Sequence, residues 1–190
     1  MTLHRRIDPS VFRTATILVA EGNRSLRRAL RDVLLGMGFP VILLAGNTAE
    51  AMRQIVQQQP NLLLLDYRLP GGNGLALTRR LRRDKGDLRK LPIILMAEAP
   101  DAALVMAARD AGVHEVVVKP LSVETLMLRL MRVLQVPRRF ITTTNYIGPD
   151  RRRQGERRRQ PDRRFRPAEP TRQERRRRPS RRSGLDRRAP

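Results

Sequence analysis

LLLLDYRLPGGNG (residues 62–74) decides the fold of this chain, because it opens with a continuous apolar run that ends in a carboxylate. A run without polar alternation is typical of a strand that is buried on both faces of a parallel sheet. Four further runs of this kind are spread along the first two thirds of the chain. They are TILVA (16–20), VILLA (41–45), PIILMA (92–97) and VVVK (116–119).

Apolar residues with a period near 3.6 follow each of these runs, which predicts helices between the strands. Gly38 ends the first helical segment, and Thr48 is expected to cap the second. Five strand–helix units predict an α/β fold, a doubly wound parallel sheet with helices on both faces. The helical segments are residues 26–37, 48–56, 74–81, 102–111 and 122–134.

Charged residues stand where three of the strands end. Glu21 follows the first run, Asp66 closes the third and Lys119 closes the fifth, whereas the fourth ends at Ala97. In an open α/β sheet the functional site lies beyond the carboxyl ends of the strands. We therefore expect the site of this protein among these residues.

Composition restricts the class of protein. A chain of 190 residues suits one domain with an extension, and no cysteine is present for a disulfide or a thiolate metal site. Neither a signal peptide nor an apolar run long enough to cross a membrane is visible, so a cytoplasmic protein without membrane insertion is predicted. No nucleophile–base pair or Gly-rich phosphate loop stands outside the strand ends, so we do not expect an enzyme.

The chain divides by composition. We expect an N-terminal extension over residues 1–14, a domain over 15–137, a linker over 138–149 and a tail over 150–190. RRFITTTNYI (138–147) is also compatible with one edge strand. The tail is charged, contains prolines and has few large apolar groups, so it is predicted to be disordered on its own.

The segments ILVAEGN (17–23), LLLLDYRLPGGNG and VVVKPL (116–121) resemble two-component response-regulator receiver (CheY-like) domains. The resemblance implies a flavodoxin-like (βα)5 sheet with strand order 2-1-3-4-5 and a role in phosphorelay signal transduction. It also implies that Asp66 accepts the phosphoryl group and that Lys119 contacts it. Mg²⁺ would be held by Glu21, Asp66 and the carbonyl of Arg68.

Three positions depart from the pattern of that family. Gly22 replaces the second acid of the first turn, Ala97 replaces a hydroxyl residue, and Val116 replaces a switch aromatic. Mg²⁺ binding is then weakened, since few carboxylates remain. One interpretation is a degenerate, pseudo-receiver domain in which Asp66 and Lys119 persist as an ion pair. The other is a response regulator that is phosphorylated at Asp66.

The tail carries a repeat. An acid followed by two arginines recurs on a six-residue grid from Asp150, although positions 168 and 180 miss it. The tail holds eighteen arginines, six acids and no lysine, net +12 of the chain's +22. One explanation is that the acids merely dilute repulsion among the arginines. A second is salt-dependent binding to nucleic acid, although each carboxylate opposes a phosphate backbone. The acids on the six-residue grid are Asp150, Glu156, Asp162, Glu174 and Asp186.

A guanine nucleotide requires both signs of charge. Arginine suits its Hoogsteen edge, its ring face and its phosphates, and a carboxylate suits the N–H donors of its Watson–Crick edge. The stretch from Tyr146 to Arg152, with the repeated DRR, also resembles the arginine-rich tails of CheY-like effectors that bind cyclic di-GMP and act on protein partners such as the flagellar motor. A protein partner, motor, kinase or other signalling protein, is therefore expected. The residues expected to contact cyclic di-GMP are Asp150, Arg151, Arg152, Arg157, Arg158, Asp162, Arg163 and Arg164.

Overall fold

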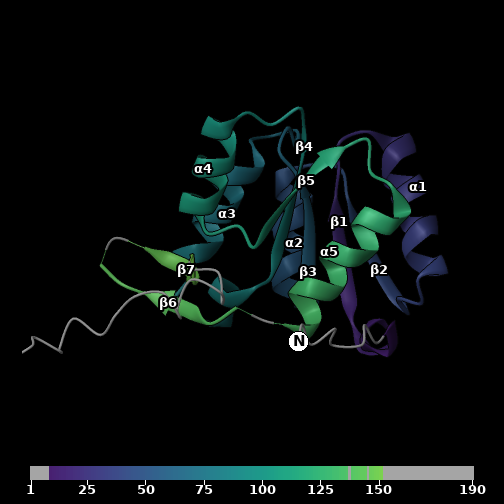
Figure 1. The fold of residues 1–190 in the computed structure, drawn as a ribbon, viewed down its shortest axis with the longest axis horizontal. Coiled ribbons are helices and arrows are strands. Elements are labelled where there is room, and N and C mark those ends of the chain that lie inside the picture. Colours follow the sequence, from purple (N-terminus) through teal and green to yellow (C-terminus); the bar gives the residue numbers. More distant parts are fainter. Residues whose placement is uncertain (1–8, 137, 145, 152–190) are drawn as a thin grey trace, which may run out of the picture. The chain divides into compact units, whose positions relative to one another are not determined.

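A computed structural model describes residues 9–136, 138–144 and 146–151 of the protein. In this part of the chain, strands and α-helices alternate, followed by a β hairpin (Figure 1). The strands are β1 (Thr16–Ala20), β2 (Val41–Ala45), β3 (Leu62–Asp66), β4 (Ile93–Glu98), β5 (Glu115–Lys119), β6 (Phe140–Thr142) and β7 (Ile147–Pro149). The α-helices are α1 (Arg24–Gly36), α2 (Thr48–Gln58), α3 (Gly74–Arg82), α4 (Ala102–Ala111) and α5 (Val123–Gln135), and the 3₁₀ helices are η1 (Pro9–Thr14) and η2 (Asp87–Lys90).

The first five strands form one parallel sheet in the order β2-β1-β3-β4-β5, which confirms the predicted flavodoxin-like fold. The register pairs Ala20 with Leu65 and Asp66 with Met96, so β1, β3 and β4 end at one edge. β3 is buried along its whole length, as its unbroken apolar run predicts.

Side chains that alternate along each strand divide the core into two layers. Leu18 of β1 packs with residues of α2, α3 and α4, whereas Ile17 packs with residues of α1, α5 and η1. Figure 1 shows α3 and α4 on the opposite side of the sheet from α1 and α5. Phe12 of η1 is fully buried and stacks on Phe39, so part of the segment expected to be an extension contributes to the core.

Short polar side chains start the five α-helices by accepting a hydrogen bond from a backbone N–H of the first turn. The second helix differs from the expectation, because Asn47 is its cap and not Thr48. The hydroxyl of Thr48 instead donates to the carbonyl of Gly71, 2.7 Å away, in the loop after β3. The capping residues are Asn23, Asn47, Asn73, Asp101 and Ser122.

The segment 138–149, for which the sequence predicts a linker, contains the antiparallel hairpin of β6 and β7. The hairpin packs near the end of α4, at Gly112. This glycine has φ +88°, and a Cβ there would lie 2.8 Å from the carbonyl oxygen of Ile147. A side chain at position 112 would therefore both strain the backbone and displace the hairpin.

Arg82, the last residue of α3, joins the hairpin to the sheet. Its guanidinium is buried and donates to the carbonyls of Arg89, Leu91 and Gly112 at 2.8–3.0 Å, while the ring of Phe140 covers it at 5.6 Å. No carboxylate of the described residues pairs with this charge. Burial lowers the pKa of Arg82 to about 10, so it stays charged at neutral pH.

His114 lies beside Arg82 and accepts a hydrogen bond at Nδ1 from the backbone N–H of Ile93, 3.1 Å away. Burial, together with the charges of Arg82 and Arg138, lowers the pKa of His114 to about 3. The folded protein therefore holds this imidazole neutral well below the pH at which it would be protonated in the unfolded chain.

We predict that acid destabilises the protein through His114. Between about pH 6.5 and 3 the unfolded chain binds a proton that the folded protein does not, so the free energy of unfolding falls by several kcal/mol as the pH falls through this range. Urea unfolding at a series of pH values should show this slope, and His114→Gln, which keeps an acceptor, should flatten it. In a His4→Gln variant the remaining imidazole should stay neutral by NMR down to about pH 4; titration near pH 6.5 would contradict the prediction.

Candidate functional site

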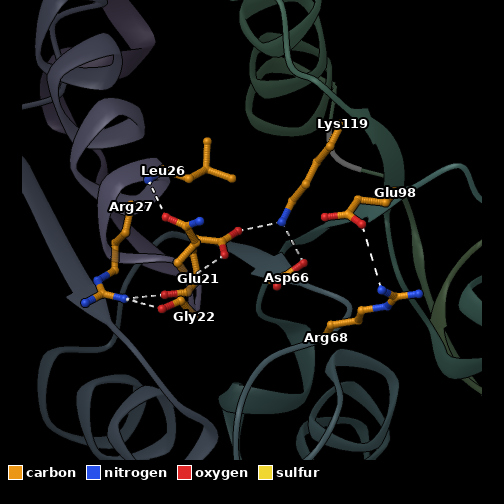
Figure 2. Close-up of polar contacts among 9 residues, drawn as sticks. Glu21, Gly22, Leu26, Arg27, Asp66, Arg68, Glu98 and Lys119 are labelled. Atoms are coloured by element: carbon orange, nitrogen blue, oxygen red, sulfur yellow. Dashed lines mark hydrogen bonds and ion pairs between the residues drawn. The ribbon is translucent and has the colours of Figure 1, made fainter.

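The carboxyl ends of β1, β3 and β5 bring together the three charged residues that the sequence singled out (Figure 2). Nζ of Lys119 donates to Oε2 of Glu21 at 2.6 Å and to Oδ1 of Asp66 at 2.9 Å. The other carboxylate oxygen of Glu21 accepts from the backbone N–H of Asn23 at 2.8 Å. We call Glu21, Asp66 and Lys119 the charged triad.

The charged triad is largely removed from water. Glu21 is only 2 % exposed and the side chain of Lys119 only 10 %. Burial disfavours the ammonium, but its hydrogen bonds to Glu21 and Asp66 outweigh that penalty, so the pKa of Lys119 lies above its ordinary value. Two carboxylates and one ammonium leave the triad with one excess negative charge.

Three side chains near the charged triad, those of Arg27, Arg68 and Glu98, were not predicted from the sequence, which assigned a role only to the backbone carbonyl of Arg68. Nη1 of Arg27 donates to the backbone carbonyls of Glu21 and Gly22, at 2.5 and 3.3 Å, which fixes the first turn. At the mouth, Arg68 and Glu98 face each other at 3.8 Å, and both side chains are mostly exposed. Arg27 lies in the first turn of α1, where an arginine ordinarily indicates a solvated face. The sequence pattern therefore gives no sign that Arg27 contacts the carbonyls of Glu21 and Gly22.

The residues that depart from the family pattern can also be placed. Ala97 lies near the end of β4, buried and without a hydroxyl, and Val116 is a half-buried aliphatic residue of β5. Gly22 faces Pro70, because a Cβ at position 22 would lie 2.7 Å from Cδ of that proline. A carboxylate at position 22 therefore requires Pro70 to move.

The described residues are a poor set of ligands for Mg²⁺. This ion requires near-octahedral oxygen coordination, yet both carboxylates of the charged triad are bonded to Lys119, and the position of a third is closed by Pro70. No group of three acidic, His or Cys residues in the described ranges is arranged to hold a metal ion. The metal-binding roles of Glu21, Asp66 and the Arg68 carbonyl stay predictions.

An apolar hollow of about 470 Å³ opens beside Lys119, between α1 and α5. The remaining tail residues of the sequence prediction, Arg152, Arg157, Arg158, Asp162, Arg163 and Arg164, lie outside the described residues. Asp150 and Arg151 are described and are far along the chain from the charged triad; Arg151 pairs with Asp110 of α4 at 3.2 Å. None of the helices described is long and apolar enough to span a lipid bilayer.

Comparison with known proteins agrees with the geometry. A model of the response regulator receiver domain matches residues 17–131, more than half of the chain. The chain belongs to the response regulator receiver family. Members of this family act in two-component signalling, and receiver domains typically bind Mg²⁺.

Two curated response regulators are similar in sequence to the receiver domain of this protein. The phosphate regulon transcriptional regulatory protein PhoB of Pseudomonas aeruginosa is 33 % identical over 120 residues, which cover 63 % of this chain and 52 % of PhoB. The DNA-binding response regulator MtrA of Mycolicibacterium smegmatis is 33 % identical over 114 residues, which cover 60 % of this chain and 48 % of MtrA. The chain thus spans about half the length of these relatives.

A solved structure has the same fold over the receiver domain. The signal receiver domain of a signal transduction histidine kinase from Syntrophus aciditrophicus superposes with a TM-score of 0.60 and 27 % identity, covering 69 % of this chain and 98 % of that domain.

We predict that Lys119→Met strongly destabilises the protein at pH 7. Glu21 and Asp66 would be left as two buried carboxylates without a cation, which costs about 3–5 kcal/mol of unfolding free energy. Acidification should restore part of the loss, since protonation removes the repulsion.

Urea unfolding of Lys119→Met at pH 7 and pH 5 measures both effects. The matched control is Arg68→Met, which breaks an exposed pair and should cost less than about 1 kcal/mol. Equal stability of the two variants at pH 7 would show that Lys119 does not hold the site together.

Proposed function

We propose that this protein is a stand-alone receiver-fold signalling protein whose phosphorylation site is no longer its main input and whose arginine-rich tail binds cyclic di-GMP. The observation that carries the proposal is the six-residue repeat of an acid followed by two arginines, which begins at Asp150. The globular part then serves as a platform that docks on a protein partner.

The charged triad supports the pseudo-receiver part of the proposal. A phosphoryl group on Asp66 has no hydroxyl at position 97 to engage, and Val116 has no ring that could rotate to report it. Two-state signalling requires contacts that differ between the states, and these two contacts are lacking. Lys119 bonded to both carboxylates is then a structural ion pair.

The composition of the tail supports a guanine ligand over a generic polyanion. Arginine without lysine favours bidentate and stacked contacts, whereas lysine would serve for simple attraction. Regularly placed carboxylates weaken binding to a phosphate backbone but pair with the N–H donors of guanine. Cyclic di-GMP presents each of these groups twice, so successive repeat units can wrap one or two molecules.

Exposed apolar side chains on α4, β5 and α5 support a docking role for the globular part. Met106, Val118 and Leu128 are each between 45 and 52 % exposed, and β5 is an edge strand of the sheet. Response regulators work with kinases and other signalling proteins, so the proposed partner is a protein of this kind.

A second candidate function is a response regulator that is phosphorylated at Asp66, with a basic tail that is passive or binds nucleic acid. Asp66 and Lys119 lie at the strand ends where the family resemblance places the phosphoryl acceptor and its lysine. Nζ of Lys119 is 2.9 Å from Oδ1 of Asp66, and this proximity favours the second candidate. PhoB and MtrA, which match the globular part, are named as a transcriptional and a DNA-binding regulator.

We predict micromolar or tighter binding of cyclic di-GMP to the full-length protein, measured by calorimetry at moderate salt with GTP and a short RNA as competitors. Glu156→Gln/Asp162→Asn should weaken cyclic di-GMP binding about tenfold, because guanine loses its carboxylate partners. The same variant should bind RNA more tightly, since it is more positive. Parallel changes in both affinities would mean that the tail recognises charge alone.

We further predict little stable acylphosphate on the protein when acetyl phosphate and Mg²⁺ are supplied. Intact-mass measurement at neutral pH distinguishes the two candidate functions, with Asp66→Asn as the control. Stoichiometric phosphorylation of the wild type that Asp66→Asn abolishes would favour the second candidate.

A further inference from the structure

A basic hollow of about 370 Å³ lies between α3, the end of α4 and the hairpin. Arginines from α3 and the residue after it face the aromatic ring of the hairpin across this space. The hollow is at the opposite end of the strands from the charged triad, since Arg82 contacts Gly112, which precedes β5, and Lys119 ends β5. Its lining residues are Arg79, Arg82, Arg83, Asp110, Ala111, Thr144, Tyr146 and Ile147.

The charge of this hollow is not balanced. Arg82, at its base, is buried and bonded only to neutral carbonyls apart from a contact with His114. Arg79 and Arg83 make no ion pair with any residue in the described ranges. The one acid in the lining, Asp110, is already paired with Arg151. An anion entering here meets Arg79 and Arg83, neither of which is paired with a carboxylate of the described residues, above the buried charge of Arg82.

The tail repeat begins at the wall of the same hollow. The backbone N–H of Asp150 donates to the carbonyl of Arg139 at 2.7 Å, which continues the hairpin ladder. The guanidinium of Arg151 lies over the ring of Tyr146, 3.7 Å from its centroid. Nε of Arg151 is buried, and no described residue accepts a hydrogen bond from it. The first acid–arginine step of the repeat is thus held against two residues that line the hollow, Tyr146 and Asp110.

We infer that this hollow, with Arg79 and Arg83 as its binding groups and Arg151 at its wall, binds a phosphate group of cyclic di-GMP. The inference rests on the proposed function and adds a site on the folded domain to it. An arginine guanidinium can donate two hydrogen bonds to two oxygens of one phosphate. A nucleotide base could stack on the guanidinium of Arg151, which itself lies over the ring of Tyr146.

The test is calorimetric titration of cyclic di-GMP into full-length wild type, Arg79→Gln/Arg83→Gln and a control variant, Arg53→Gln/Arg80→Gln. Arg53 and Arg80 are exposed, as Arg79 and Arg83 are, so the control removes the same charge, but Arg80 lines a different hollow, with Thr48 and Gly72. We expect the first variant to weaken binding about tenfold or more, because Arg79 and Arg83 line the hollow, and the control less than about twofold, because its charges act only at a distance and are screened.

Three outcomes overturn or separate the inferences. Equal weakening by both variants means long-range charge and overturns the site, as does no weakening by Arg79→Gln/Arg83→Gln. In the latter case the tail binds alone and the proposed function stands. Absence of any cyclic di-GMP binding to wild type overturns the proposed function.

A titration with pyrophosphate, monitored by tyrosine fluorescence, tests phosphate binding to the hollow separately from nucleotide binding. With Tyr67→Phe as background, Tyr146 is the single intrinsic fluorophore, since the chain has two tyrosines and no tryptophan. A saturable change of its emission that Arg79→Gln/Arg83→Gln abolishes and the control preserves would support a phosphate site. No such change would overturn it.

Discussion

The parallel register of β1, β3, β4 and β5 is the constraint on which the rest of the structure depends. It requires strands that are apolar on both faces, and it sets Glu21, Asp66 and Lys119 at one edge although 98 residues separate the first from the last. Burying three charges at that edge is tolerable only because the ammonium bonds to both carboxylates. The pairing of the strands, and not the secondary-structure preference of each residue, therefore determines which three charged side chains meet in the site.

Buried charges at the two ends of the sheet are stabilised differently, by ion pairs at one end and by backbone carbonyls at the other. At the carboxyl end, one lysine is bonded to two acids at 2.6 and 2.9 Å, which leaves one net negative charge. At the other end, Arg82 has no acid and is held by the carbonyls of Arg89, Leu91 and Gly112. In the first arrangement both carboxylates are bonded to Lys119, whereas the second leaves a positive field that extends into the hollow under the hairpin.

The fold could be predicted from the sequence to within a residue at the strands, because continuous runs such as LLLLD allow few alternatives. The positions of Asp66 and Lys119 followed from the same rule. Arg82 could not be found, since an arginine late in a helix ordinarily indicates solvent or the helix dipole. RRFITTTNYI indicated at most one edge strand, and the pairing of β6 with β7 was not predicted. The docking of the hairpin depends on Gly112, a contact between distant parts of the chain that no local pattern contains.

Gly22 and Pro70 together determine which side chains fit in the first turn of this site. A family member that loses its second acid could in principle regain it by a single substitution. Here the proline ring lies 2.7 Å from where the new Cβ would be, and a ring atom of proline cannot swing aside without its backbone. An acid at position 22 therefore requires a change at position 70 as well, so these two positions, which are far apart in the sequence, can only be substituted together.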